Sequence, residues 1–125
     1  MSSILYTKEH EFIECMSDSQ IRIGITQYAL SELGEIVFVE LKDIGESLET
    51  GDEIGSVESV KTVSGFYTPA AGTISNTNQD IINDPEQLNK ATDPTWLIEL
   101  KLDDDLSFDE LMTADDYSSY TQSLA

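Results

Sequence analysis

Short stretches of alternating apolar and polar residues, separated by turn signals, constrain the fold of this chain more than any other feature. Residues 21–25 alternate strictly and place three isoleucines on one side, and residues 98–102 repeat the pattern. Residues 36–41 are apolar on both faces, which predicts a strand that is covered on both sides. Turn signals such as Thr50-Gly51-Asp52 follow at short intervals. Many short strands without long helices between them predict a mainly β sandwich or barrel.

Short helices are predicted at two places within this β pattern. Thr26 is placed to cap a helix that runs through Leu33, and Gly34 follows at its exit. Asp84-Pro85 predicts the start of a helical turn that ends near Leu88, because a proline at the first helical position lacks an N–H that would otherwise have no partner.

A longer helix is predicted at the C-terminal end, over about 114–124. Thr113 and Asp116 stand three residues apart at its start, which is the spacing of a capping box. Tyr117 and Tyr120 then follow at helical spacing, which predicts that these two tyrosines pack the helix against the β body.

The charge balance excludes several classes of partner. Twenty-five of the 125 residues are acidic and six are basic, which gives a net charge of −19. Such a surface repels nucleic-acid phosphates and anionic lipid headgroups, so we expect neither nucleic acid nor membrane as a partner. Leu, Ile, Val and Phe still supply 33 residues, more than the roughly 20% that a folded core requires. We therefore expect one folded, monomeric domain over 1–125.

Candidates for metal or catalytic chemistry are few. His10 is the only histidine and Cys15 the only cysteine, which leaves no transition-metal cluster and no recognisable nucleophile system. The acidic run 103–105, followed by Asp109, is interpreted as a solvated link. We predict no metal site and no catalytic residue, and we assign His10 to structure.

The single cysteine favours a reducing compartment, and no export signal is visible, so a cytoplasmic location is expected, with the mitochondrial matrix left open.

Lysine is scarce, which makes one lysine informative. Lys61 lies within 55–69, a stretch with only two charges, and the glycines Gly51 and Gly72 flank it. The pattern alone permits one strand over 57–63 from which Lys61 extends into solvent. No Asn-Gly or Asp-Gly pair indicates a hairpin at this position.

The residues around Lys61 resemble the modification hairpin of lipoyl domains, and specifically that of the glycine cleavage system H-protein family. The resemblance rests on Glu58-Ser59-Val60-Lys61, with Gly51 ten residues before the lysine and Gly72 eleven after it. Biotin carriers share the fold type but place methionines beside the lysine. Further blocks that are similar to the family follow in the same order, at 6–12, 24–29, 33–41, 67–72, 84–86, 96–98 and 114–117.

The resemblance implies a fold, a cofactor and a set of partners. The expected fold is a lipoyl/biotinyl-type barrel-sandwich hybrid with short helices, whose lipoyl-binding core spans about 20–103. Lipoic acid would be joined to Lys61 by an amide. The protein would then be a non-catalytic shuttle that moves the aminomethyl group of glycine from a pyridoxal-phosphate glycine decarboxylase to a folate-dependent aminomethyltransferase. Dihydrolipoamide dehydrogenase would reoxidise the dithiol.

The resemblance also implies roles for single residues. Lys61 is the attachment point, and Glu58-Ser59-Val60 would help a lipoate-attaching enzyme recognise the turn. Gly51 and Gly72 would permit the flanking backbone to bend. Glu11 corresponds to a family position that can hold the loaded arm, and a structural role for it is equally open.

Departures from the family pattern leave alternatives open. Gly65 replaces a common acid, Glu32 replaces a histidine found in some members, and Phe12 replaces the usual tryptophan. These changes leave open a lipoyl donor or relay protein with little role in glycine cleavage. Two further alternatives are a Schiff-base lysine at position 61 and a plain acidic interaction module.

Overall fold

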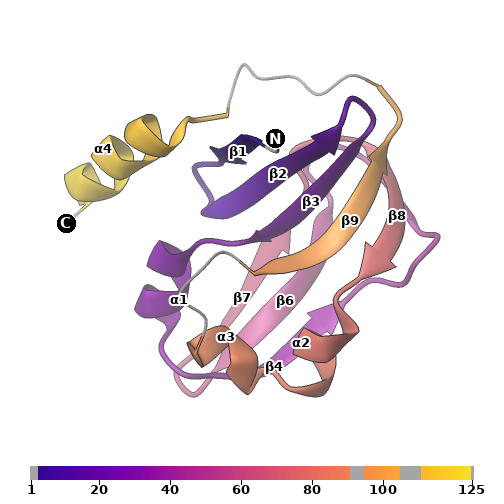
Figure 1. Ribbon diagram of the computed structural model, residues 1–125. Coiled ribbons are helices and arrows are strands. Elements are labelled where there is room, and N and C mark those ends of the chain that lie inside the picture. The colour runs from indigo at the N-terminus through magenta and orange to yellow at the C-terminus, as the bar shows by residue number, and fades with distance from the viewer. Residues whose placement is uncertain (1–2, 91–94, 105–110, 125) are drawn as a thin grey trace.

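The computed structural model describes residues 3–90, 95–104 and 111–124 and contains short strands and helices in the order shown in Figure 1. The first half of the chain forms β1 (Ser3–Tyr6), β2 (Glu11–Ser17), β3 (Gln20–Ile25), α1 (Gln27–Leu33), β4 (Ile36–Leu41), β5 (Ser47–Leu48) and β6 (Glu53–Ser59). The second half forms β7 (Val63–Tyr67), β8 (Gly72–Thr77), α2 (Gln79–Asn83), α3 (Glu86–Lys90), β9 (Trp96–Leu102) and α4 (Ala114–Leu124). The acidic link that begins at 103–105 lies largely outside the described residues.

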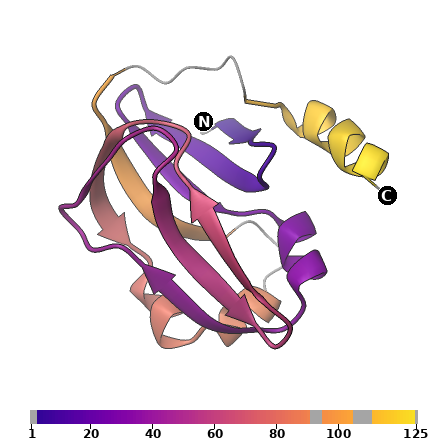
Figure 2. The same ribbon diagram turned by 180° about the vertical axis from the view of Figure 1, so that it is seen from behind.

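The strands form two antiparallel sheets. One has six strands in the order β1-β2-β3-β9-β8-β5, and the other has three in the order β4-β6-β7. Figure 2 shows the three-stranded sheet lying in front of the six-stranded sheet. The predicted mainly β fold is confirmed, and β1 and β2 extend the larger sheet beyond the expected 20–103 core.

The core lies between the two sheets and is built from the inward faces of their strands. The alternation at 21–25 is confirmed, because all three isoleucines of β3 are buried. Burying an aliphatic side chain of this size contributes roughly 1.5–3 kcal/mol. The other fully buried side chains that fill this layer are Ile13, Ile36, Val39, Ile54, Val57, Ile74, Leu97, Ile98 and Leu100.

Strand β4 corrects the prediction for residues 36–41. Ile36 and Val39 are buried, but Val37 and Phe38 are 44% and 51% exposed. The register with β6 shifts between Ile36 and Phe38, which is a β-bulge. The prediction that this strand is covered on both faces is therefore wrong, because the bulge inserts an extra residue and turns two consecutive apolar side chains toward solvent.

The helix boundaries follow the capping signals. The Thr26 side chain accepts a hydrogen bond from the Ala29 N–H at 3.2 Å, and Gly34 ends α1 with a φ of 89°, as predicted. Helix α3 continues to Lys90 rather than ending near Leu88. Helix α2 was not predicted, because its five residues carry no clear helical period.

Helix α3 also secures the edge of the smaller sheet. The Ile36 N–H donates to Asn89 Oδ1 at 2.8 Å, and Asn89 Nδ2 donates to the Ile36 carbonyl at 3.0 Å. Both backbone groups of this edge residue are thereby satisfied at the start of β4.

The C-terminal helix packs through its tyrosines as predicted. Tyr117 is buried, and its ring stacks on Tyr6 with the centroids 4.6 Å apart. Its hydroxyl lies 2.8 Å from Thr26 Oγ1 and 2.7 Å from His10 Nδ1. The hydroxyl of Tyr120 donates to the Lys8 carbonyl at 3.4 Å. These contacts hold α4 beside β1 (Figure 1) and agree with a structural role for His10.

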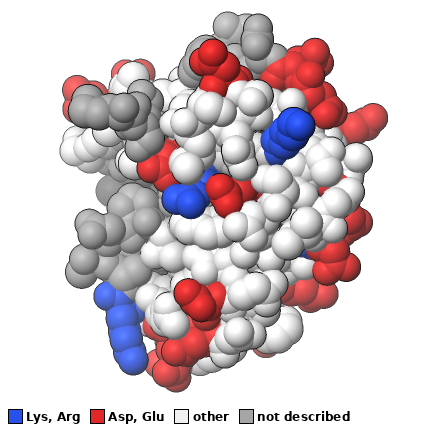
Figure 3. Space-filling view, turned by 45° about the vertical axis from the view of Figure 1, so that its right-hand side comes forward, with Lys and Arg blue, Asp and Glu red and all other residues white. Residues whose placement is uncertain are grey.

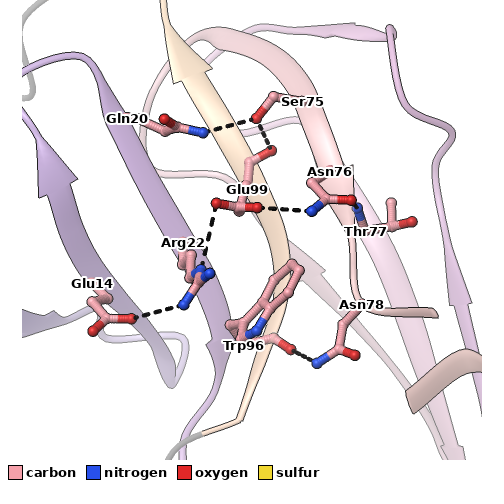
Figure 4. Close-up of polar contacts among 9 residues, drawn as sticks. All are labelled: Glu14, Gln20, Arg22, Ser75, Asn76, Thr77, Asn78, Trp96 and Glu99. Atoms are coloured by element: carbon pink, nitrogen blue, oxygen red, sulfur yellow. Dashed lines mark hydrogen bonds and ion pairs between the residues drawn. The ribbon is translucent and has the colours of Figure 1, made fainter. Parts of the chain in front are cut away.

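The outer face of the larger sheet carries a polar cluster around Arg22 (Figure 4). The Arg22 guanidinium lies 3.5 Å from Glu99 and 3.9 Å from Glu14, and its central carbon lies 4.7 Å from the centre of the Trp96 ring. Glu99 also accepts a hydrogen bond from Asn76 at 2.9 Å. Figure 3 shows a face of the molecule on which uncharged atoms predominate, with a basic group beside acidic ones near the middle and most other acidic side chains toward the edges.

Candidate functional site

Lys61 lies at the tip of the hairpin formed by β6 and β7. Strand β6 ends at Ser59 and β7 begins at Val63, so Val60-Lys61-Thr62 forms the turn. The Ser59 N–H donates to the Thr62 carbonyl at 2.7 Å and closes the hairpin. The interpretation of 57–63 as one continuous strand is therefore wrong.

The Ser59 side chain organises this turn. Its Oγ accepts hydrogen bonds from the N–H groups of Lys61 and Thr62, both at 3.1 Å. No residue of the turn has a positive φ, so no glycine is needed in it. The serine hydroxyl takes over the donors that the turn leaves unpaired. Searching for Asn-Gly or Asp-Gly misses such a hairpin, whereas a serine two residues before the lysine is a signal that local turn chemistry could have supplied.

The tip of the hairpin is held against the connection between α1 and β4. The Val60 N–H donates to the Glu35 carbonyl at 3.0 Å. The Lys61 side chain passes over Gly34, where an added Cβ would lie 3.1 Å from Lys61 Cε, and its Nζ donates to the Glu32 carbonyl at 3.3 Å. The turn backbone is thus fixed while the lysine side chain is exposed.

The two glycines singled out from the sequence have different roles. Gly51 has a φ of 92°, and its N–H donates to the Thr68 carbonyl at 2.8 Å, so it bends the chain before β6 as expected. Gly72 lies in β8 and has no positive φ. A Cβ at Gly72 would lie 2.3 Å from the Lys101 carbonyl oxygen, so this glycine allows β8 to approach β9 closely and does not bend the chain.

Glu11 is the first residue of β2, and its buried side chain lies beside the end of β7 that is opposite the hairpin tip. Its Oε1 accepts a hydrogen bond from the Thr7 hydroxyl at 2.7 Å, and its Oε2 accepts one from the Tyr67 N–H at 3.4 Å. Burial raises the pKa of Glu11 to about 7, although both hydrogen bonds oppose this shift. The carboxyl joins the β1–β2 turn to β7, which favours a structural role.

Two hollows border the smaller sheet. A cavity of about 190 Å³ lies beside the hairpin, and Glu32 and Gly65, which depart from the family pattern, both line it. A wider cleft of about 1010 Å³ lies near the other end of β7, and Glu11 and Gly51 line it. Phe12, the third departure, is buried and packs against Gly24. The structure therefore brings Glu32 and Gly65 together and places Glu11 along a different cleft.

Comparison with known proteins places this arrangement in a family. The family model described as glycine cleavage H-protein matches residues 4–124. The chain belongs to the glycine cleavage H-protein family. The glycine cleavage system H protein of Oceanobacillus iheyensis is 44% identical over 120 residues, which cover 95% of this chain and 94% of the relative. That of Geobacillus kaustophilus is 45% identical over 115 residues, covering 91% and 90%.

A solved structure agrees with the sequence relatives. The crystal structure of a glycine cleavage system H protein from Mycobacterium marinum superposes with a TM-score of 0.84 at 36% identity. The alignment covers 96% of this chain and 97% of that chain. The expected family and its barrel-sandwich fold are both confirmed by this agreement.

Membership of the H-protein family establishes the general role of the chain. It is a non-catalytic lipoyl carrier of the glycine cleavage system, its cofactor is lipoic acid, and it works with the other components of that system. The residues fit this cofactor, because an exposed primary amine stands on a rigid turn with the chain around it held by backbone hydrogen bonds. Among the described residues no helix is long and apolar enough to span a membrane.

Proposed function

We propose that Lys61 is the lipoylated residue and that the β6–β7 hairpin presents it to the enzymes of glycine cleavage. The observation that carries the proposal is the exposed Lys61 amine at the tip of a turn fixed by Ser59 and by the Glu35 carbonyl. An acyl arm attached there would be long and mobile, while its base would stay in one place.

The residues around Lys61 support this role in two ways. Ser59 fixes the backbone of the turn, because its hydroxyl accepts hydrogen bonds from the N–H groups of Lys61 and Thr62. The Lys61 ammonium has three N–H donors, whereas the amide formed with lipoate would have one. Modification would therefore weaken the hydrogen bond from Nζ to the Glu32 carbonyl. Bound lipoate supplies thiol–disulfide chemistry at the far end of the arm.

Membership of the H-protein family supports a proposal for the specific partners. We infer that the aminomethyl group of glycine passes from a pyridoxal-phosphate glycine decarboxylase to a folate-dependent aminomethyltransferase by way of this chain. Dihydrolipoamide dehydrogenase then restores the disulfide, and a lipoate-attaching enzyme modifies Lys61 beforehand. The bacterial origin of the relatives supports a cytoplasmic location for these encounters.

Intact mass measurement tests the attachment site. Incubation with a lipoate-attaching enzyme, ATP and lipoate should add one lipoyl group to the wild-type chain and none to Lys61→Arg. Lys42→Arg is the matched control, since it keeps the hairpin unchanged and should gain the same mass as the wild type. A wild-type mass that does not rise, or a Lys61→Arg variant that is modified normally, would overturn the assignment.

The relay alternative is separated by a second measurement. Gly65 and Glu32 line the cavity beside the hairpin, which is the observation that keeps this alternative in view. The lipoylated chain, combined with the decarboxylase, should support glycine-dependent exchange of bicarbonate into the carboxyl group of glycine. Normal lipoylation without this exchange would favour a lipoyl donor.

A further inference from the structure

A cluster of exposed apolar side chains surrounds the tip of the β6–β7 hairpin. Val37 and Phe38 of β4, together with Val60 and Val63 beside Lys61, are 44% to 65% exposed. We call these four residues the tip patch. Clustered exposed apolar side chains on a soluble domain commonly mark a surface that contacts another protein.

Strand pairing places much of the tip patch on one face. Phe38 lies opposite Glu58 on β6, and Glu58 lies opposite Val63 on β7. These three side chains form a row on the solvent face, because Val39 and Val57, which alternate with them, are buried in the core. Figure 2 shows this sheet at the front of the molecule, with the hairpin tip beside the α1–β4 connection.

The stability of the sheet does not account for these side chains. Ile36 and Val39 already fill the inner face of β4, and Asn89 satisfies the edge at Ile36. The bulge then directs both Val37 and Phe38 outward. Exposed apolar residues on an edge strand increase the risk of aggregation, so their presence beside Lys61 needs a functional reason.

We propose that the tip patch is the surface on which the lipoate-attaching enzyme docks. This inference rests on the proposed role of Lys61. The attaching enzyme must enclose Lys61 Nζ itself, whereas the other components react at the far end of the acyl arm. Only the attaching enzyme therefore has to cover the side chains that border the lysine at the hairpin tip.

The reaction requires close approach to the backbone of the turn. The neutral Nζ attacks the carbonyl carbon of lipoate that ATP has activated as a mixed anhydride with a nucleotide phosphate. The amide bond forms, the bond from carbonyl carbon to phosphate oxygen breaks, and the nitrogen releases a proton as the nucleotide leaves. The contact with the Glu32 carbonyl must break for this attack, because it holds Nζ against the end of α1.

Charge around the tip patch defines the chemistry of the docking partner. The exposed carboxylates Glu35, Glu40 and Glu58 border the apolar side chains. A complementary surface has an apolar centre and a basic rim, which steers encounter without a large buried area. The rate of lipoylation at low substrate concentration should therefore fall as ionic strength rises.

Lipoylation kinetics of the full chain test this docking surface. The double variant Val37→Thr/Phe38→Thr and the single variant Val63→Thr replace patch residues with threonine, a polar β-branched residue that is favoured in strands. Ile44→Thr is the matched control, because Ile44 is 57% exposed but lies in the connection after β4. Circular dichroism and thermal unfolding first establish that each variant is folded.

The expected result is a selective loss of enzyme recognition. The double variant should lose about tenfold in kcat/KM for lipoylation, mainly through KM, as truncating a central interface side chain costs over 1 kcal/mol. Val63→Thr should lose several-fold, and Ile44→Thr should stay within about twofold of the wild type. Labelling of Lys61 by a small acylating reagent should be unchanged in all three.

The outcomes separate the two proposals. Wild-type lipoylation at Lys61 with unchanged kinetics in folded patch variants overturns the docking surface and leaves the attachment site standing. Failure of the wild type to be lipoylated at Lys61 overturns both. If the double variant does not fold, Val63→Thr decides the matter, because an unchanged kcat/KM in that variant also overturns the docking surface.

Discussion

The two ends of strand β7 are built in opposite ways. At one end, the turn that holds Lys61 is exposed, and its N–H groups donate hydrogen bonds to the Ser59 hydroxyl and the Glu35 carbonyl. At the other end, the Tyr67 N–H donates to the Glu11 carboxyl group, and Glu11 is only 3% exposed. The comparison indicates that strand β7 runs from an exposed turn that presents an amine for modification to a buried carboxyl of β2 that is locked into the fold.

The buried end is also the strained end. His10, next to Glu11, is the one described residue other than glycine with a positive φ, at 73°. Its carbonyl accepts the Thr26 N–H at 3.0 Å, and its ring contacts Tyr117 and Tyr28. Burial lowers the pKa of His10 despite the nearby Glu9 and Glu32 carboxylates. Several independent contacts hold this conformation, as a strained backbone requires.

The largest expected effect on stability concerns Glu11 and pH. Its folded pKa of about 7 lies above the 4.5 of a free glutamate, so the folded state binds the proton more tightly. The stability that this tighter proton binding adds to the folded state is fully present below about pH 4.5 and is lost as the pH rises through about 7. The loss is on the order of 3 kcal/mol. In Glu11→Gln this loss should be absent.

Urea unfolding at pH 4.5 and pH 8 measures this difference. The free energy of unfolding of Glu11→Gln, relative to the wild type, should rise between the two pH values. Glu86→Gln, on the exposed start of α3, is the control and should follow the wild-type pH dependence. Parallel pH profiles for Glu11→Gln and the wild type would show that the two ends of β7 do not differ in this way.

A smaller effect is expected at Ser59. Ser59→Ala leaves the N–H groups of Lys61 and Thr62 without their acceptor and should lower the free energy of unfolding by about 1–2 kcal/mol. Ser56→Ala, on the same strand, is the control, because the Ser56 side chain makes no hydrogen bond within the described part of the chain. Equal denaturation midpoints for the two variants would contradict the role given to the serine hydroxyl.

The smallest effect is expected at Lys61 itself. Lys61→Gln removes the hydrogen bond from Nζ to the Glu32 carbonyl, and this hydrogen bond is exposed to solvent. The free energy of unfolding should therefore change by less than about 0.5 kcal/mol. Lipoylation should nevertheless be lost completely. Thermal unfolding and intact mass on the same sample measure both effects, and a clear destabilisation would mean that Lys61 also supports the fold.

Local patterns in the sequence predicted much of the fold. The alternation at 21–25, the cap at Thr26 and the tyrosines of α4 depend on neighbours within one element, and all three were confirmed. Helix α2 was missed, and Gly72 was assigned to a bend that the structure does not show. The role of Gly72 depends on the Lys101 carbonyl of another strand, which local sequence does not reveal.

The sequence by itself determined the family, the lipoyl cofactor and the identity of the conspicuous lysine, because ordered motifs and the scarcity of lysine are properties of the chain. The tertiary structure alone decided which side chains surround that lysine. The β4 bulge that exposes Phe38, and the burial of Glu11 against Thr7 and Tyr67, both depend on contacts between separate strands. Strand register and burial are set by the whole fold, so no local pattern specifies them.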